Sequence, residues 1–310
     1  MHFEPNPEAI PPRGAARRTR RGLAIIEMLV AILIIVMLIS LIVPSLLHAR
    51  SVARRTSCMN NLKQLTIAMQ NYESQYGIFP PGYVYAPGKY GENLSGFGWC
   101  AVMLPYLDHG PLAEQIDWSQ PIGAPAHDTL RTVHLSVMRC PAESNDGGPI
   151  ISLDVAFAPA NYAGSFGPAD MRNDPEDRQG MFSRNSATRA SDVSDGMAHT
   201  LLMGERIGGT FLDARNADTV QCITTWAGTG PSPNDPGREA AEFVLFRAAN
   251  RPGSRERDAQ DASSAHPESS CFGMADGAVR VMSSNVDLGV YQALSTRSGG
   301  EMEGRLPPPK

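Results

Sequence analysis

The stretch RRGLAIIE (residues 20–27) leads directly into the apolar run Met28 to Leu47, and the two together decide the fold. A basic pair, a glycine, four apolar residues and one carboxylate precede positions that are almost all apolar. At roughly 1.5 Å per residue, a helix of this length crosses a hydrocarbon core of ~30 Å. The sequence therefore predicts a transmembrane helix, with the spanning segment at about residues 28–47.

Glu27 is the acidic residue of this apolar region. A carboxylate costs on the order of 2.5–3.5 kcal/mol at the centre of a spanning helix and less near its end. Because of that cost, we expect Glu27 to have a partner.

The segment closely resembles the prepilin signature of type IV pilins and type II secretion pseudopilins. In those proteins a peptidase cuts after the glycine, and the new N-terminal residue is N-methylated. The resemblance implies that Gly22 ends the leader, that Leu23 is the mature N-terminus, and that Glu27 pairs with the N-terminal amine of a neighbouring subunit during assembly. Pro44 lies where many pilins have a helix-kinking proline, whereas Leu23 departs from their usual phenylalanine.

Three other interpretations of the N-terminus remain open. A secretory signal peptide has an apolar core of about 7–15 residues and a small-x-small cleavage site, but this run is longer and Leu47-His48-Ala49 is a poor site. Arg20-Arg21 also fits a twin-arginine signal, although the core that follows is very hydrophobic. A plain signal anchor with an incidental Glu27 is the third interpretation.

The leader is basic, and by the positive-inside rule it holds the N-terminus in the cytoplasm. Its arginines are Arg13, Arg17, Arg18, Arg20 and Arg21. Arg50, Arg54 and Arg55 on the far side weaken this argument without reversing it. We therefore expect a single-pass protein of the inner (cytoplasmic) membrane, with a cytoplasmic N-terminus and a periplasmic or extracellular globular domain.

Charge and composition describe the exported part. The chain has a formal net charge of −5, and the leader has five arginines against two glutamates, which leaves −8 on the mature chain. An acidic domain is a poor partner for nucleic acid, whose binding proteins present basic patches. Gly (29) and Pro (25) are abundant, which indicates a domain rich in loops and turns.

The five cysteines lie far apart, and none forms a C-x-x-C pair, so zinc-ribbon and thioredoxin-like motifs are unsupported. They are Cys58, Cys100, Cys140, Cys222 and Cys271. One or two disulfides suit an oxidising compartment, but spacing does not give their connectivity. Small buried apolar side chains are an equally good interpretation of each.

The helical pattern continues beyond the membrane segment. Leu62, Leu65, Met69, Tyr72 and Tyr76 form a one-sided apolar stripe, and Gly77 with Pro80-Pro81 ends it. The predicted organisation is a leader (1–22), an N-terminal helix (23–76), a globular domain (78–304) and a disordered tail (305–310). The fold class is α+β and pilin-like, with the helix packed on an antiparallel β-rich domain.

Within the globular domain the signals are short. We expect a short helix at residues 99–107 and a compact apolar run at 242–246. Strands are expected at 134–140, 154–162, 200–203 and 219–226. Asp276-Gly277 between alternating apolar residues predicts a hairpin over 272–282. Residues 228–238 and 250–265 are expected to be exposed loops.

This body resembles a large bacterial pilin-like family, domain of unknown function 1559 (DUF1559), which has a prepilin N-terminus and a C-terminal H-x(9)-D-G signature. His266 is followed ten positions later by Asp276-Gly277. Residues 58–65, 104–107, 161–164, 195–196 and 200–205 also follow the family pattern, and the resemblance runs from about 20 to 301. It implies an architecture but no activity.

Motifs of enzyme chemistry are missing from the sequence: it has no G-x-S-x-G, P-loop, H-E-x-x-H or G-x-G-x-x-G. For His266 and Asp276-Gly277 we favour a structural interpretation, a type I′ turn preceded by a loop histidine, over metal binding or catalysis. Glu205 is expected to be half-buried and paired with Arg206 or Arg280. Aromatic residues in a Gly-rich stretch indicate either ordinary packing or a carbohydrate surface: Tyr85, Tyr90, Phe97 and Trp99.

The sequence thus favours a structural subunit of a type IV pilus or type II secretion-like system, processed by a prepilin peptidase. We expect it to contact other pilin-like subunits through its N-terminal helix and to contact membrane lipid, without nucleic acid, cofactor, metal or enzymatic activity. The alternative is a surface-tethered module that binds a carbohydrate or peptide and uses the pilin export route. An exported hydrolase has no motif to support it.

Overall fold

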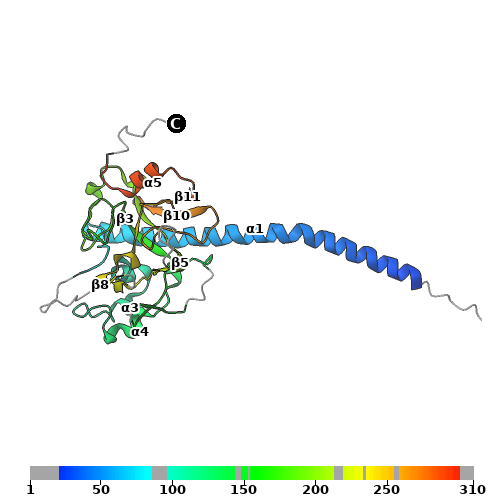
Figure 1. Cartoon of the computed structure of the whole chain (residues 1–310), viewed down its shortest axis with the longest axis horizontal. Coiled ribbons are helices and arrows are strands. Elements are labelled where there is room, and N and C mark those ends of the chain that lie inside the picture. Colours follow the sequence, from blue (N-terminus) through cyan, green and yellow to red (C-terminus); the bar gives the residue numbers. More distant parts are fainter. Residues whose placement is uncertain are drawn as a thin grey trace, which may run out of the picture. The chain divides into compact units, whose positions relative to one another are not determined.

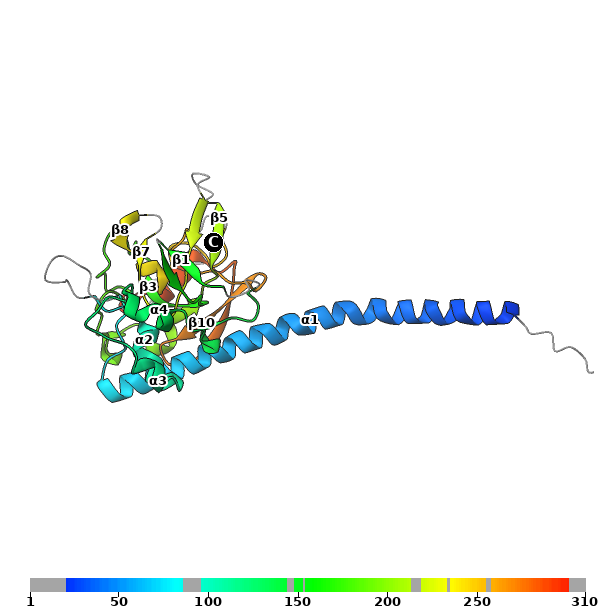
Figure 2. The same cartoon turned by 90° about the horizontal axis from the view of Figure 1, so that it is seen from below.

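The computed structural model describes residues 21–85, 96–143, 148–152, 154–212, 219–232, 235–254 and 258–300. A long N-terminal helix is followed by many short strands and helices (Figures 1 and 2). The chain divides into two compact units, residues 1–50 and 51–310. Helix α1 (Arg21–Tyr76) runs through the boundary, so its two halves are described separately.

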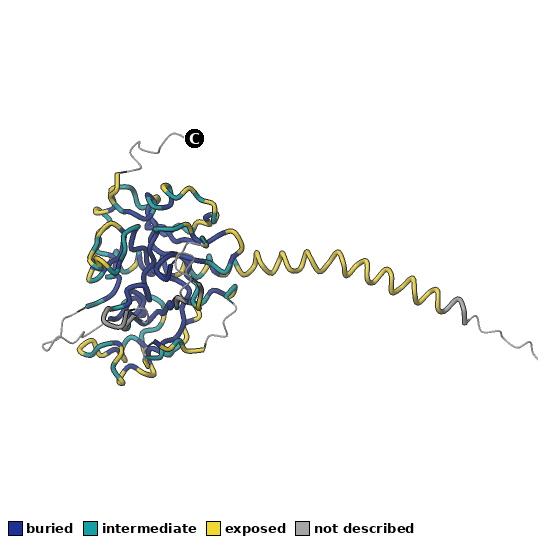
Figure 3. Tube along the Cα trace, in the orientation of Figure 1, coloured by how far each residue is buried: buried dark blue, intermediate teal, exposed yellow. Residues whose placement is uncertain are grey.

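The first half of α1 presents apolar side chains all around the helix. Its large apolar side chains from Ile25 to Leu47 are between 46% and 69% exposed (Figure 3). Pro44 lies inside the helix, which continues past it. In the described part of the chain, α1 is the helix that is long and apolar enough to cross a membrane, a test that an N-terminal signal sequence would also meet.

The second half of α1 packs against the globular body on one side. Leu62, Leu65 and Met69 are at most 1% exposed, which confirms the start of the predicted stripe. The stripe fades at its end, where Tyr72 is half-buried and Tyr76 is 55% exposed. Gly77 follows with a φ of 71°, the left-handed conformation that commonly ends a helix.

A five-stranded sheet in the order β11-β10-β4-β3-β9 forms the centre of the body. Three of its neighbour pairs are antiparallel, and β3 pairs with β9 in parallel. The fold is therefore α+β, as the sequence predicts. The strands are β3 (Tyr162–Gly167), β4 (Leu201–Glu205), β9 (Leu245–Arg247), β10 (Ser269–Met274) and β11 (Val279–Ser283).

Both faces of β10 are covered, and all six of its residues are buried. Cys271 shares a core with the buried face of α1, whereas Phe272 and Met274 belong to a second core with Tyr291 of α5 (Leu288–Ser295). Successive side chains of a strand point to opposite faces. Helix α1 therefore packs on one face of the sheet and α5 on the other.

Close approach of α1 to the sheet requires a glycine in β10. A Cβ atom on Gly273 would lie 2.5 Å from Cγ2 of Thr66, well inside van der Waals contact. The glycine thus lets the helix lie directly on the strand.

Small elements surround this centre. Three two-stranded sheets pair β1 (Ile150–Ser152) with β2 (Val155–Phe157), β5 (Gly209–Leu212) with β6 (Thr219–Cys222), and β7 (Pro231–Ser232) with β8 (Asp235–Glu239). The short helices are α2 (Trp99–Met103), α3 (Gly110–Ala113) and α4 (Asp128–Arg131). The 3-10 helices are η1 (Leu104–Leu107), η2 (Pro125–His127), η3 (Ser136–Met138), η4 (Ala190–Asp192), η5 (Met197–His199) and η6 (Ala241–Phe243).

Several local predictions are confirmed and others are wrong. The short helix at 99–107, the strand at 200–203 and the hairpin at 272–282 are present. The strand expected at 134–140 is absent, and the 3-10 helix η3 lies there instead. Its residues Val137 and Met138 are buried. The strand expected at 154–162 is split between β2 and the start of β3, and that at 219–226 ends at Cys222.

The two segments expected to be exposed loops differ from that description. Residues 228–238 contain strands β7 and β8. Residues 258–263 are buried because their acids pair with Arg247, whose guanidinium lies 2.6 Å from Asp258 and 3.3 Å from Asp261. The prediction of an exposed loop rested on polar composition, but charged side chains can be buried when they are paired. The predicted tail, 305–310, lies outside the described residues.

Candidate functional site

The predicted processing and assembly residues lie at the start of α1. Gly22 and Leu23 fall within the helix, and Glu27 is exposed on it. Its neighbours Ile26 and Met28 are also exposed, by 61% and 69%. The roles expected for Gly22, Leu23 and Glu27 remain predictions.

The two ends of the H-x(9)-D-G signature are separated by strand β10. His266 precedes the strand and Asp276 follows it, so the structure does not bring these two residues together. A metal site or catalytic pair made of His266 and Asp276 is therefore not supported.

The Asp276-Gly277 turn differs from the predicted type I′ turn. Gly277 has a φ of 83°, but Asp276 is not among the described non-glycine residues with positive φ, which a type I′ turn needs at both positions. Gly277 donates its N–H to the Met274 carbonyl (2.9 Å), and the Met274 N–H donates to the Ala278 carbonyl (2.8 Å). This is a three-residue loop with a left-handed glycine at its end.

This turn is attached to the docked half of α1. Lys63 Nζ donates to the Gly277 carbonyl at 2.6 Å, and Thr66 Oγ1 lies 3.3 Å from the same oxygen. Gln70 Nε2 donates to the Ala275 carbonyl at 2.6 Å. The Asp276 carboxylate accepts the Ala278 N–H at 2.9 Å, which fixes the turn. The D-G end of the signature therefore holds the helix.

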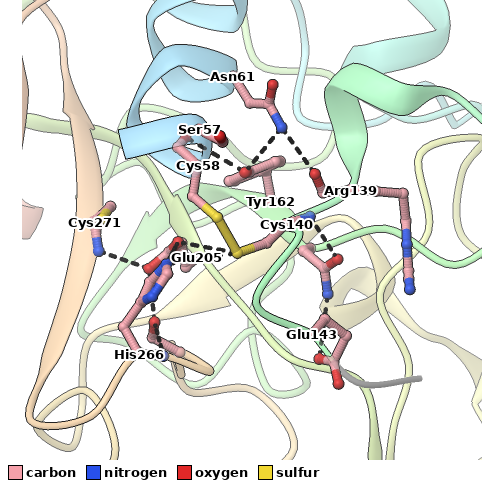
Figure 4. The surroundings of a disulfide bond; sticks show 12 residues. Ser57, Cys58, Asn61, Arg139, Cys140, Glu143, Tyr162, Glu205, His266 and Cys271 are labelled. Carbon is pink, nitrogen blue, oxygen red and sulfur yellow. Dashed lines mark hydrogen bonds and ion pairs between the residues drawn. A yellow bond between two sulfur atoms is a disulfide. The ribbon is translucent and has the colours of Figure 1, made fainter. Parts of the chain in front are cut away.

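The His266 end lies in a buried cluster with a disulfide (Figure 4). Cys58 of α1 is bonded to Cys140, which follows η3, and their Cα atoms are 5.2 Å apart. His266 Nε2 lies 3.2 Å from Glu205 Oε1 and 3.6 Å from Cys140 Sγ, while the same carboxylate oxygen lies 3.7 Å from Cys140 Sγ. All four residues are at most 6% exposed.

Glu205 was expected to be half-buried and paired with Arg206 or Arg280, and this expectation is wrong. The residue is 2% exposed, and its partners come from the loop before β10 and from β10 itself. In addition to the His266 contact, its Oε2 accepts the Ser264 hydroxyl at 2.7 Å and the Cys271 N–H at 2.8 Å. Arg206 instead donates to the Leu245 carbonyl (3.3 Å).

The other cysteines of the chain, Cys100, Cys222 and Cys271, are buried and form no disulfide. Burial raises the pKa of the Cys100 thiol, and burial together with the Glu205 charge raises the pKa of the Cys271 thiol. These thiols are therefore protonated near neutral pH. The sequence left the pairing open, and its signal for the cluster was indirect: Cys58, Glu205 and His266 fall within segments that follow the family pattern.

Of the aromatic residues considered as a carbohydrate surface, the three that the structure describes do not form one. Phe97 and Trp99 are at most 1% exposed, and Trp99 Nε1 donates to the Val244 carbonyl. Tyr85 is half-buried with the Arg184 guanidinium over its ring, and Tyr90 lies outside the described residues. Tyr85, Phe97 and Trp99 therefore serve packing.

A cavity of about 440 Å³ lies elsewhere in the body. Its lining combines backbone of glycines 148, 208 and 209 with a few side chains from β1 and β6, among them Ile150 and Gln221, and with Arg139. This volume falls in the range of small-molecule sites, about 300–1,000 Å³.

Comparison with known proteins supports the resemblance seen in the sequence. No curated protein and no solved structure matches the chain. A family model does match, over residues 47–289, which are most of the chain and include both Cys58 and the whole signature. The chain belongs to this family, described as proteins of unknown function (DUF1559).

Proposed function

We propose that the chain is a membrane-anchored, pilin-like structural subunit of a type IV pilus or type II secretion-like system. The observation that carries this proposal is the contrast between the two halves of α1, one exposed and apolar, the other docked on the body. Family membership and the N-terminal apolar helix are compatible with a membrane-anchored exported protein.

The exposed half needs an apolar environment. Eighteen large apolar side chains between Ile25 and Leu47 are exposed, and burying each one stabilises by roughly 1.5–3 kcal/mol. Lipid and the helices of neighbouring subunits both supply such an environment. In the docked half, Leu62, Leu65 and Met69 are already covered by the body, so the requirement for partners applies chiefly to the first half.

Glu27 gives the proposal its specificity. A carboxylate among exposed apolar side chains is costly in a membrane unless it is paired. A prepilin peptidase that cuts after Gly22 would create an α-amine on Leu23, and the amine of a neighbouring subunit would pair with Glu27. This role places the N-terminus in the cytoplasm and the body outside, and it requires no catalysis, cofactor or nucleic acid.

Processing is tested on protein extracted from the membrane of the native host. N-terminal sequencing and intact mass should give a chain that begins at Leu23. A chain that retains its arginine-rich leader, or that begins near Arg50, would refute the pilin-like role.

Assembly is tested with Glu27→Gln and with Glu73→Gln, a matched control in the docked half of the same helix. We expect Glu27→Gln to be cleaved normally but to lose co-purification with other pilin-like subunits, while Glu73→Gln retains it. Equal co-purification of both variants would contradict a role of Glu27 in assembly.

A tethered binding module is the second candidate, and the cavity of about 440 Å³ favours it. Such a module uses α1 as an anchor only, so Glu27→Gln would leave its activity intact. If both the parent protein and Glu27→Gln are cleaved normally and neither co-purifies with partner subunits, this candidate is supported over the first.

A further inference from the structure

We propose that Cys58 and Cys140, when reduced, bind one Zn²⁺ together with His266 Nε2 and Glu205 Oε1. The site is independent of the proposed subunit role. The disulfide and the metal would then be two alternative cross-links between α1 and the body, formed by the same two cysteines.

The distances between the ligand atoms fit a tetrahedral zinc site. Zinc bonds of about 2.3 Å to sulfur, about 2.05 Å to nitrogen and about 2.1 Å to oxygen require edges of about 3.6 Å (S–N), about 3.6 Å (S–O) and about 3.4 Å (N–O). The observed edges from Cys140 Sγ are 3.6 Å to His266 Nε2 and 3.7 Å to Glu205 Oε1, and the N–O edge is 3.2 Å. All four ligand atoms lie within 4.8 Å of one another.

The two sulfur atoms must separate for the metal to enter. They are bonded in this structure, and a tetrahedral site places them about 3.8 Å apart. With Cα atoms 5.2 Å apart, rotation of the two side chains achieves this after the bond is broken. Every newly synthesised chain passes through this dithiol state before the disulfide forms.

The charge of the site is also suitable. Two thiolates and one carboxylate supply −3, and neutral histidine supplies none, so Zn²⁺ leaves −1. Structural zinc sites with three cysteines and one histidine have the same charge.

Surrounding groups already orient the ligands. Glu205 Oε2 is held by the Ser264 hydroxyl and the Cys271 N–H, which leaves Oε1 directed at the cluster. The Asn161 side-chain oxygen accepts the Cys140 N–H at 2.9 Å. Partners of this kind are typical around zinc ligands and fix their orientation.

The chemistry of loading is simple. A trialkylphosphine breaks the S–S bond of the purified protein: phosphorus takes the oxygen of one water molecule and becomes the phosphine oxide, and the two water protons end on the two sulfurs. Zn²⁺ then displaces both thiol protons to the buffer. Because the four ligands come from distant segments, binding should stabilise the folded body.

The test uses the full-length protein in detergent, reduced with phosphine and supplied with Zn²⁺ or with a chelator. We expect one zinc per chain after removal of free metal, and a melting midpoint that is higher with zinc than with chelator. The disulfide form should retain no zinc, and chelator should leave its midpoint unchanged. Co²⁺ in place of zinc should give the absorption of a tetrahedral site with thiolate ligands.

Variants assign the ligands. His266→Gln and Glu205→Gln, each purified with the disulfide intact so that folding is checked before reduction, should lower zinc affinity tenfold or more. Cys100→Ser, a buried thiol outside the cluster, should retain one zinc per chain.

Three outcomes would overturn the proposal. The first is a reduced protein that retains no zinc or that zinc fails to stabilise. The second is retention of zinc by the disulfide form. The third is stoichiometric zinc in the Cys58→Ser/Cys140→Ser variant.

Discussion

Removing the disulfide should destabilise the body strongly, because this bond joins α1 to a segment 82 residues away. In the chain-entropy model, closing a loop of that length contributes about 4.5 kcal/mol at 25 °C, and measured losses are about 2–5 kcal/mol. The double variant Cys58→Ala/Cys140→Ala, kept free of metal, should therefore unfold at a midpoint roughly 10 °C lower than the parent.

Tryptophan fluorescence is the appropriate measurement, since Trp99, Trp118 and Trp226 all lie in the body and none lies in the first half of α1. Cys100→Ala/Cys222→Ala is the matched control, because it also removes two buried sulfur atoms and no cross-link. The difference between the two variants in lost free energy of unfolding measures the stabilisation that the disulfide provides. An excess below about 1 kcal/mol would refute the cross-link as a major stabilising feature.

Three further predictions concern the rest of the body. Gly277→Val should lower the free energy of unfolding by about 1–3 kcal/mol, because valine does not tolerate a φ of 83°. Thermal melts measure this, and an unchanged melting midpoint would mean that the turn does not require glycine. Arg247→Met should lower the free energy of unfolding by about 3–5 kcal/mol in urea, since it removes the cation that pairs with buried Asp261 and one of the two arginines that pair with Asp258; a loss below about 1 kcal/mol would contradict this. Burial raises the pKa of Cys100, so a thiol reagent at neutral pH should label it far more slowly in folded than in denatured protein; equal rates would contradict its burial.

The parts of the fold that follow from sequence are those set by local pattern. A continuous apolar run and a stripe at helical spacing predict α1 almost to the residue, and Asp276-Gly277 predicts the β10–β11 hairpin. Even there the turn type was wrong. The extra residue in the loop puts only Gly277 in the left-handed conformation, and loop length is not visible in a two-residue motif.

The errors fall where tertiary contacts override local pattern. Residues 134–140 have strand-like composition, yet Val137 and Met138 are buried from a 3-10 turn. Residues 258–263 look like a polar loop, but Arg247 neutralises their acids and they are buried. The cluster was missed for a related reason: no sequence spacing links Cys58 to Cys140, and their pairing exists only once α1 lies on the sheet.

The signature motif gains a physical meaning from this packing. The strand between its two ends lies under α1, with Gly273 at the closest approach to Thr66. The His266 end meets the helix at Cys58, through the disulfide, and the Asp276-Gly277 end meets it at Lys63 and Gln70. The H-x(9)-D-G motif therefore marks strand β10, and the residues at both ends of this strand contact the docked half of α1, directly or through the disulfide. Substitutions in these residues should therefore act first by loosening the docked half of α1 from the sheet.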